Sequence, residues 1–183
     1  MNYSIVKIQK ISFKEKEELS NGRWIARYML SEDETYCVCL EVVIDHEPSA
    51  EDVSNLVSSY IIDIKKEKIS NVVLYDISNN VNVIEVNGIS TWLDKATRVG
   101  LRNSLTVEKN AEHVNTTLYL NGIALVMPVD TALGILDAIE LYAIDCYRTT
   151  ESHKAAIAAA TTIAEVEEYD YTAGYPTHPQ FTV

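Results

Sequence analysis

The chain has 183 residues, of which 47% are hydrophobic and 23% are charged, and its formal net charge is -12. This composition supports a buried core and excludes a wholly disordered chain. The excess of negative charge repels phosphate backbones, which disfavours nucleic-acid binding. No apolar run approaches the ~20 residues that cross a bilayer, so we expect no membrane anchor and a protein made and kept in the cytoplasm.

The three cysteines predict reduced thiols, because their number is odd. Cys37 and Cys39 lie two positions apart in a strand-like stretch, on one face, where they are poorly placed to bridge each other. A metal site would match no common zinc spacing; it would have to combine Cys37, Cys39, His46 and Cys146. Cysteine is also among the most often buried residue types, so we expect no metal and no cofactor.

The first third of the chain is predicted to be β-rich. Three stretches alternate in polarity or are rich in β-branched and aromatic side chains: residues 3–11, 23–30 and 35–44. Asn21-Gly22 and the acidic residues 31–34 provide the turns between them. We therefore expect an antiparallel meander.

Ser49 and Asp52 have the spacing of a capping box, which predicts the start of a helix. Apolar side chains follow at helical spacing on one face: Val53, Leu56, Val57, Tyr60, Ile61 and Ile64. Lysines suit the end of this helix, where the helix dipole favours cations: Lys65, Lys66 and Lys68. With residues 72–77 and 81–86 predicted as two more strands, residues 1–88 form a β-rich module with one helix.

Asn87-Gly88 marks the change to a second module, residues 89–183. Thr91 and Asp94 predict the start of a helix that carries Leu93, Ala96, Val99, Leu101 and Leu105. Arg98 and Arg102 lie four positions apart on this helix, the spacing at which arginines meet carboxylates across a helix interface. Their partner is expected to be Glu140 or Asp145 in the same domain, or an acid on a neighbouring subunit.

A β-hairpin is predicted within residues 116–127. Asn121-Gly122 fits a type I′ turn, in which both central residues have positive φ. That turn places Leu120 opposite Ile123 and Leu118 opposite Leu125. These four residues share one face, and the other face carries Thr117, Tyr119, Ala124 and Val126.

After Pro128 a long helix is predicted from about residue 130 to residue 147. Its core face carries Ala132, Ile135, Leu136, Ile139, Tyr142, Ala143 and Cys146. The opposite arc holds Asp137 and Glu140, but also Leu133, Leu141 and Ile144. Two interpretations stay open: a helix buried on two sides within its own domain, or a contact between subunits.

The remainder of the chain is predicted as two short helices and an extended tail. The first helix spans residues 151–160, and Thr162 with Glu165 caps the second, which runs to residue 168. Tyr169, Tyr171 and Tyr175 then offer large apolar area with polar tips. Two interpretations stay open: the tail lies across the surface of another protein, or it covers its own domain.

Catalytic motifs are not recognisable in the sequence. The four histidines, His46, His113, His153 and His178, lie outside any nucleophile, phosphate-binding or metalloprotease motif. The carboxylates fall mainly in turns and at helix starts, where capping and the helix dipole explain them. We expect a protein that is not an enzyme, with a hydrolase as a weaker alternative.

Several short sequence segments in the second half of the chain carry a family resemblance. They are residues 92–101 (WLDKATRVGL), residues 116–119 leading to Leu125, residues 141–147 (LYAIDCY), His153-Lys154, and residues 169–176 (YDYTAGYP). From Trp92 to Pro176 the chain resembles a domain of unknown function in virion and tail-fibre-associated proteins of phages infecting Bacteroidales, including crAss-like phages. The resemblance implies a component of the phage particle, and it carries over no functional residues.

These observations together predict an α+β protein: a β-rich N-terminal module with one helix, then a helix, β-hairpin and helix module with a short extended tail. The expected function is that of a virion structural protein made in the host cytoplasm. It would be a ring-like homo-oligomer in the neck or tail, as a collar or ring protein connecting portal and tail or as a fibre adaptor. Its predicted interface residues are Leu133, Leu141, Ile144, Arg98, Arg102, Tyr169, Tyr171 and Tyr175. The alternatives are a tail-fibre assembly chaperone that is absent from the finished virion, and a phage-encoded hydrolase.

Overall fold

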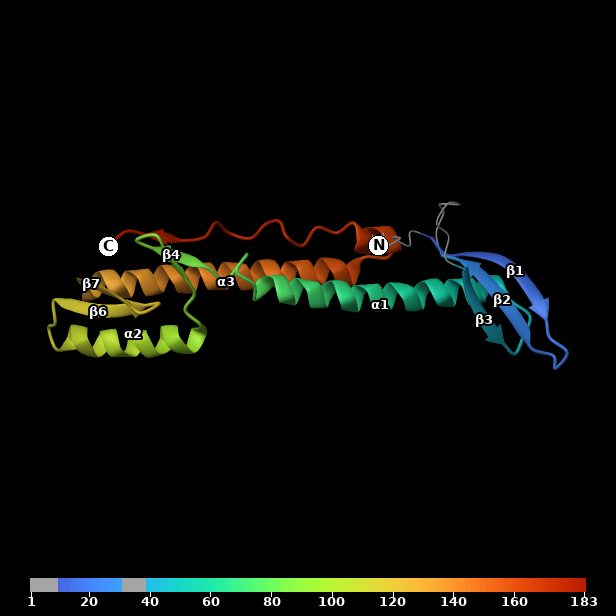
Figure 1. The fold of residues 1–183 in the computed structure, drawn as a ribbon, viewed down its shortest axis with the longest axis horizontal. Coiled ribbons are helices and arrows are strands. Elements are labelled where there is room, and N and C mark those ends of the chain that lie inside the picture. The colour runs from blue at the N-terminus through green and yellow to red at the C-terminus, as the bar shows by residue number, and fades with distance from the viewer. Residues whose placement is uncertain (1–9, 31–38) are drawn as a thin grey trace. The chain divides into compact units, whose positions relative to one another are not determined.

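The computed structural model describes residues 10–30 and 39–183, and it shows an α+β chain with a β-rich N-terminal region followed by helices (Figure 1). The described residues form two compact units. Unit 1 holds those up to Ser70 together with Ala155–Asp170, and unit 2 holds Asn71–Lys154 and Tyr171–Val183. The predicted modules divide the chain between residues 88 and 89 instead. Residues 71–88 and 155–170 therefore group differently from the prediction.

Unit 1 contains an antiparallel meander of three strands, in the order β1-β2-β3. Its members are β1 (Ser12–Glu18), β2 (Trp24–Met29) and β3 (Cys39–Ile44). Its second and third strands fall within predicted stretches, whereas its first does not. Gly22 has a φ of +76° in the turn between β1 and β2, which confirms the predicted turn at Asn21-Gly22. Most of the predicted strand at residues 3–11, and the turn at 31–34, lie outside the described residues.

Strand β1 was not predicted, because its sequence is mainly lysine and glutamate and its side chains from Lys14 onward are exposed. Its acidic residues are matched across the sheet by one cation. Arg27 of β2 forms ion pairs with Glu15 and Glu17 of β1, at 3.3 and 3.2 Å, and with Glu41 of β3, at 2.7 Å. Cross-strand pairing of opposite charges thus stabilises a strand that has no apolar face of its own.

Helix α1 (Ala50–Asp76) begins as predicted. Both the backbone N–H and the hydroxyl of Ser49 donate to Asp52 Oδ2, each at 2.7 Å. The helix is longer than expected, however, so the strand predicted at residues 72–77 is wrong. Neither glycine nor proline interrupts the chain from Ser49 to Asn82, and a β-branched run continues a helix when packing favours it, as at the fully buried Val72.

The lysines predicted to close α1 lie within it, and two of them stabilise the ends of two other helices. These are α3 (Val129–Ala159) and α4 (Ile163–Glu167). Lys65 Nζ donates to the Ala158 carbonyl at 2.7 Å, and Lys68 Nζ donates to the Glu167 carbonyl at 2.9 Å. The last carbonyls of a helix have no partner within it, so a cation is well placed there. Side chains from one helix therefore satisfy the C-termini of two others within unit 1.

Unit 2 contains a small sheet with the strand order β5-β4-β8. Strands β4 (Ile84–Val86) and β5 (Ile89–Thr91) form an antiparallel hairpin, while β8 (Gln180–Phe181) pairs with β4 in parallel. Asn87 and Gly88 have φ values of +50° and +77° at the hairpin turn. The pair predicted to separate two modules is thus a second tight turn, inside one unit.

Helix α2 (Lys95–Asn110) is capped by Asp94, whose Oδ1 accepts a hydrogen bond from the Thr97 N–H at 2.7 Å. The prediction that Thr91 begins this helix is wrong, because Thr91 ends strand β5. Strands β6 (Asn115–Leu120) and β7 (Ile123–Pro128) confirm the predicted hairpin register, with Leu118 opposite Leu125. The turn residues Asn121 and Gly122 have positive φ, as a type I′ turn requires.

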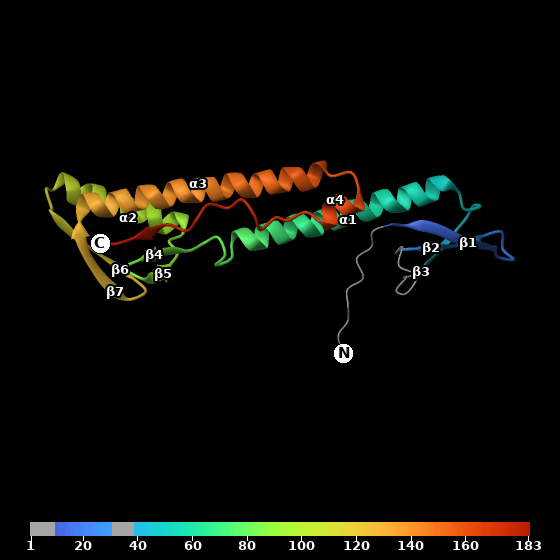
Figure 2. The ribbon, with the colours of Figure 1, turned by 90° about the horizontal axis from the view of Figure 1, so that it is seen from above.

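Helix α3 runs through residues 148–150, where a break between two helices was predicted. Its threonines fit the helix because their hydroxyls find partners: Thr149 Oγ1 donates to the Asp145 carbonyl, one turn earlier, at 3.0 Å. The capping box of Thr162 and Glu165 at the start of α4 is confirmed. In unit 2 the largest core cluster joins β4, α2, the β6–β7 hairpin and the first turns of α3 (Figure 2).

Candidate functional site

Helix α3 exposes an apolar arc within unit 2. Leu141 and Tyr147 keep 65% and 63% of their surface exposed, and Ile144, between them, keeps 37%. Leu133, predicted on the same arc, is half-buried against the core cluster. The interpretation that α3 is buried on two sides is therefore wrong at Leu141, Ile144 and Tyr147, which are exposed. Sequence reasoning missed Tyr147, although it lies three residues after Ile144, because the helix was expected to end there.

The two arginines of α2 hold that helix against α3. Arg98 is almost fully buried; its Nε donates to Glu140 Oε2 at 2.8 Å and its Nη1 to the Leu93 carbonyl at 2.6 Å. Arg102 forms an ion pair with Asp137. Glu140 was one of the predicted partners. Both arginines thus have partners within unit 2.

A hollow of about 310 Å³ lies beside these ion pairs, lined by Lys95, Arg98, Glu140, Ala143, Ile144 and Tyr147. Its walls combine an apolar side, from α3, with charged groups from both helices. Apolar surface with a polar rim is the usual composition of a protein–protein contact. The hollow and the exposed arc of α3 share Ile144 and Tyr147, so they form one continuous surface.

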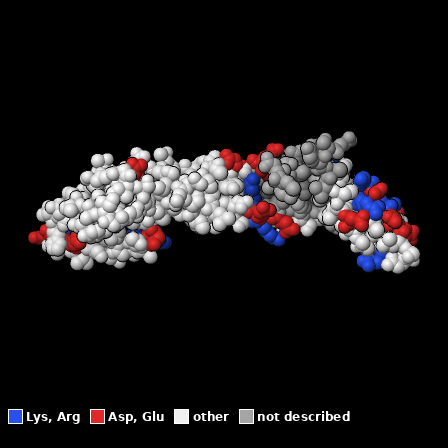
Figure 3. Space-filling model, in the orientation of Figure 1, with Lys and Arg blue, Asp and Glu red and all other residues white. Residues whose placement is uncertain are grey.

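The β6–β7 hairpin presents a second exposed apolar face. Tyr119 and Val126 keep 72% and 68% of their surface exposed, whereas Leu118 and Leu125 on the other face are buried. Ile123 lies on that other face, next to the turn, and is 49% exposed. In the view of Figure 3, unit 2 carries few charged side chains, while lysine, arginine and acidic residues gather over the β1–β3 sheet of unit 1. The face of unit 2 seen in this view thus carries less charge than the β1–β3 sheet.

The predicted tail residues belong to different units. Tyr169 lies in unit 1, whereas Tyr171 and Tyr175 pack against Tyr75 in unit 2, with ring centroids 5.9 and 5.5 Å apart. The Tyr175 hydroxyl lies 2.9 Å from the Thr150 hydroxyl. In this structure the tail after Asp170 thus covers its own unit.

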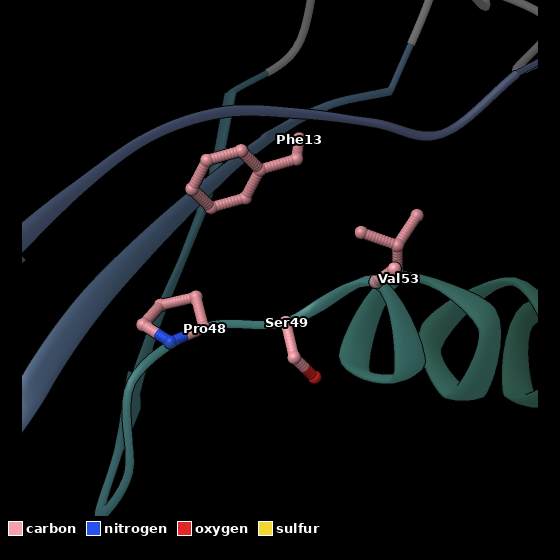
Figure 4. A pocket seen from close by; sticks show the side chains of 5 residues that line it. Phe13, Pro48, Ser49 and Val53 are labelled. Atoms are coloured by element: carbon pink, nitrogen blue, oxygen red, sulfur yellow. The ribbon is translucent and has the colours of Figure 1, made fainter.

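Unit 1 contains an apolar pocket of about 380 Å³, lined by Phe13, Pro48, Ser49, Ala50 and Val53 (Figure 4). Phe13 comes from β1, Pro48 and Ser49 precede α1, and Ala50 and Val53 lie in its first turn. The Ser49 hydroxyl points away from the Phe13 ring, and it donates to Asp52 as part of the helix cap. The pocket therefore offers mainly apolar contact.

The described cysteines differ in exposure. Cys146 is buried, and that burial raises the pKa of its thiol; Cys39 is exposed, and Cys37 lies outside the described residues. Within residues 10–30 and 39–183, no group of three or more His, Cys, Asp and Glu side chains is arranged to hold a metal ion. His46 lies 2.9 Å from both Asp45 and Asp52.

Comparison with protein-family models, with curated proteins and with solved structures gives no match to this chain. Among the described residues, no helix combines the length and apolar character needed to span a bilayer.

Proposed function

We propose that this chain is a structural protein of a bacteriophage particle, assembled as a ring-like multimer in the neck or tail and in contact with portal or tail subunits. The phage context is supported by the resemblance from Trp92 to Pro176. The assembly role is supported by the exposed apolar surfaces of unit 2. The protein acts by binding and not by catalysis.

The observation that carries this proposal is the arc of Leu141, Ile144 and Tyr147 on α3. Single exposed apolar residues are common, but three on successive turns beside a hollow make a patch of the kind that marks an interaction site. Tyrosine and leucine also add contact area with few rotatable bonds, and each Å² of apolar surface removed from water contributes ~25 cal/mol. A second subunit that covers this arc would therefore bind favourably.

A tail-fibre assembly chaperone is the alternative that a specific observation favours, namely the net charge of -12. Strong negative charge keeps a free protein soluble and opposes permanent packing of like copies. Such a chaperone would bind the same kind of partner only transiently. The two functions therefore differ in whether the chain stays in the finished particle.

Quantitative mass spectrometry of purified particles separates the two functions. A structural ring subunit is expected at several copies per particle, in constant ratio to the portal protein. A chaperone is expected to be depleted from particles but present in infected-cell lysate. Absence from particles would overturn the structural assignment.

A further inference from the structure

The last segment of the chain, residues 171–183, is extended and carries no Asp, Glu, Lys or Arg. We call it the strap. This composition is unusual in a chain with 27 acidic and 15 basic residues. Copies with a net charge of -12 repel one another, and an uncharged strap can lie on another copy without adding to that repulsion.

The second half of the strap adds a strand to the β4–β5 hairpin. The Glu85 N–H donates to the Pro179 carbonyl at 3.0 Å, and the Asn87 N–H donates to the Phe181 carbonyl at 2.9 Å. Phe181 packs against the main core cluster of unit 2. In Figures 1 and 2 the red strand β8 lies beside β4. Pairing of this kind, with backbone bonds and one anchoring side chain, is how sheet edges bind extended peptides.

The first half of the strap lies over a smaller core cluster, made of Val81, Tyr142 and Cys146. Tyr175 packs against this cluster, and its ring lies 5.6 Å from that of His153, centroid to centroid. His153 Nε2 lies 2.9 Å from the Ala173 carbonyl. Unit 2 therefore binds this extended segment along the edge of β4 and across the small cluster as far as His153, and we call these contact residues the groove.

The strap itself is held at the surface. None of residues 171–183 is fully buried, whereas the groove residues Val81, Ile84 and Val86 are at most 1% exposed. Pro176 and Pro179 restrict the strap to extended conformations before it binds, which lowers the entropy lost on docking. The strap also starts at Tyr171, where the chain passes from unit 1 to unit 2. An extended segment that begins at such a division is suited to leave its groove as a whole.

We propose that the strap is an exchangeable arm, and that in the assembled protein the strap of one copy fills the β4 groove of a second copy. The strap would make the same contacts with its own chain as with a second copy. Exchange therefore costs only the entropy of association, and this cost falls as the local concentration of copies rises. This inference rests on the proposed assembly role, because it names the contact through which copies join.

Engineered cysteines test the exchange in the full-length chain. Glu85 of β4 pairs with Gln180 of β8, so a Glu85→Cys chain and a Gln180→Cys chain are prepared separately and mixed before oxidation. Both carry Cys37→Ser and Cys39→Ser, which leaves the buried Cys146 as the one native thiol. We expect a covalent dimer that neither chain forms alone. The control mixture uses Ser90→Cys in place of Glu85→Cys. Ser90 lies on β5, which is separated from β8 by β4. The Cα atoms of residues 90 and 180 are therefore two strand spacings apart, about 10 Å, which is too far for a disulfide.

Light scattering on the same mixture before oxidation separates the two proposals. In one outcome the mixture forms a multimer but no covalent dimer, and a single chain that carries both Glu85→Cys and Gln180→Cys forms an internal disulfide. This outcome would overturn the exchange and leave the assembly role standing. A single-chain mass without covalent dimer would overturn the exchange, and it would overturn the assembly role as well if the chain is also missing from purified particles. A covalent dimer supports the exchange.

Discussion

Tyr142 lies on the buried face of α3, and its hydroxyl donates to the Val81 carbonyl at 2.6 Å. Burial of the ring raises the pKa of Tyr142 well above its usual range, so the hydroxyl stays protonated as a donor at any ordinary pH. Tyr142→Phe removes the donor and leaves that carbonyl without its hydrogen bond. We expect a loss of about 1–2 kcal/mol in the free energy of unfolding, measured by urea denaturation. Tyr147→Phe, on the exposed arc, is the control and should change it by less than ~0.5 kcal/mol; equal effects would contradict the assignment.

At the scale of elements, the start of α1 depends on pH through two groups. Hydrogen bonds from Ser49 lower the pKa of Asp52 to about 2, and those to Asp45 and Asp52 raise the pKa of His46 above its usual 6.5. The stabilisation from Asp52 is present above pH 3.8 and is lost as pH falls towards 2. The stabilisation from His46 is fully present below pH 6.5, and it is lost as the pH rises through the higher pKa of His46 in the folded protein.

The helix cap is therefore expected to be strongest between about pH 4 and pH 6.5. An NMR titration of the His46 ring checks this directly. In the folded wild type the midpoint should lie above 6.5, and Asp52→Asn should lower it. Asp63→Asn, on an exposed turn of the same helix, should leave it unchanged. A wild-type midpoint below 6.5 would show that these contacts do not form in solution.

Two glycines in unit 2 should respond to alanine with opposite signs. Gly122 has a φ of +81° at the β6–β7 turn, while Gly134 lies in the regular helix α3, and an added Cβ meets nothing within 4 Å at either position. The difference is therefore conformational. Gly122→Ala should lower the free energy of unfolding by about 1–2 kcal/mol, and Gly134→Ala should raise it by about 1 kcal/mol. Thermal unfolding of both variants checks the signs, and a neutral Gly122→Ala would argue against the type I′ turn.

Elements with strong local signals were predictable from sequence. Asn121-Gly122 fixed the hairpin register, and Ser49 and Thr162 marked the starts of α1 and α4, because each signal arises within a few residues. Elements set by distant contacts were not. Strand β1 depends on Arg27 of the next strand, and the last turns of α1 contain a β-branched run whose buried Val72 favours helix only in its tertiary context.

The residues predicted to form an interface show the same division. Leu141 and Ile144 were predicted from helical spacing, and they lie on the exposed arc. Tyr147 was missed because it was the last residue of the predicted helix, whereas α3 continues through Thr149 and Thr150, whose hydroxyls bond to the Asp145 carbonyl of α3 and to Asp76 of α1. The bond from Thr150 to Asp76 joins residues 74 positions apart, which sequence spacing does not reveal.

At the scale of the whole molecule, Leu141→Asp tests whether the arc of α3 joins copies. The side chain is 65% exposed, so the charge should leave folding nearly intact but should oppose its desolvation in a contact. We expect at least a tenfold weaker self-association by analytical ultracentrifugation, which corresponds to ~1.4 kcal/mol. Thr131→Asp, exposed near the start of the same helix, is the matched control. Unchanged association of Leu141→Asp would remove the arc from the interface.

The most direct single measurement is the mass of the full-length protein in solution by light scattering, over a range of concentrations. A structural subunit that assembles through unit 2 should reach a fixed multiple of the 20.5 kDa chain mass as concentration rises. A mass of 20.5 kDa at every concentration, from a chain that is also missing from purified particles, would contradict the assembly role.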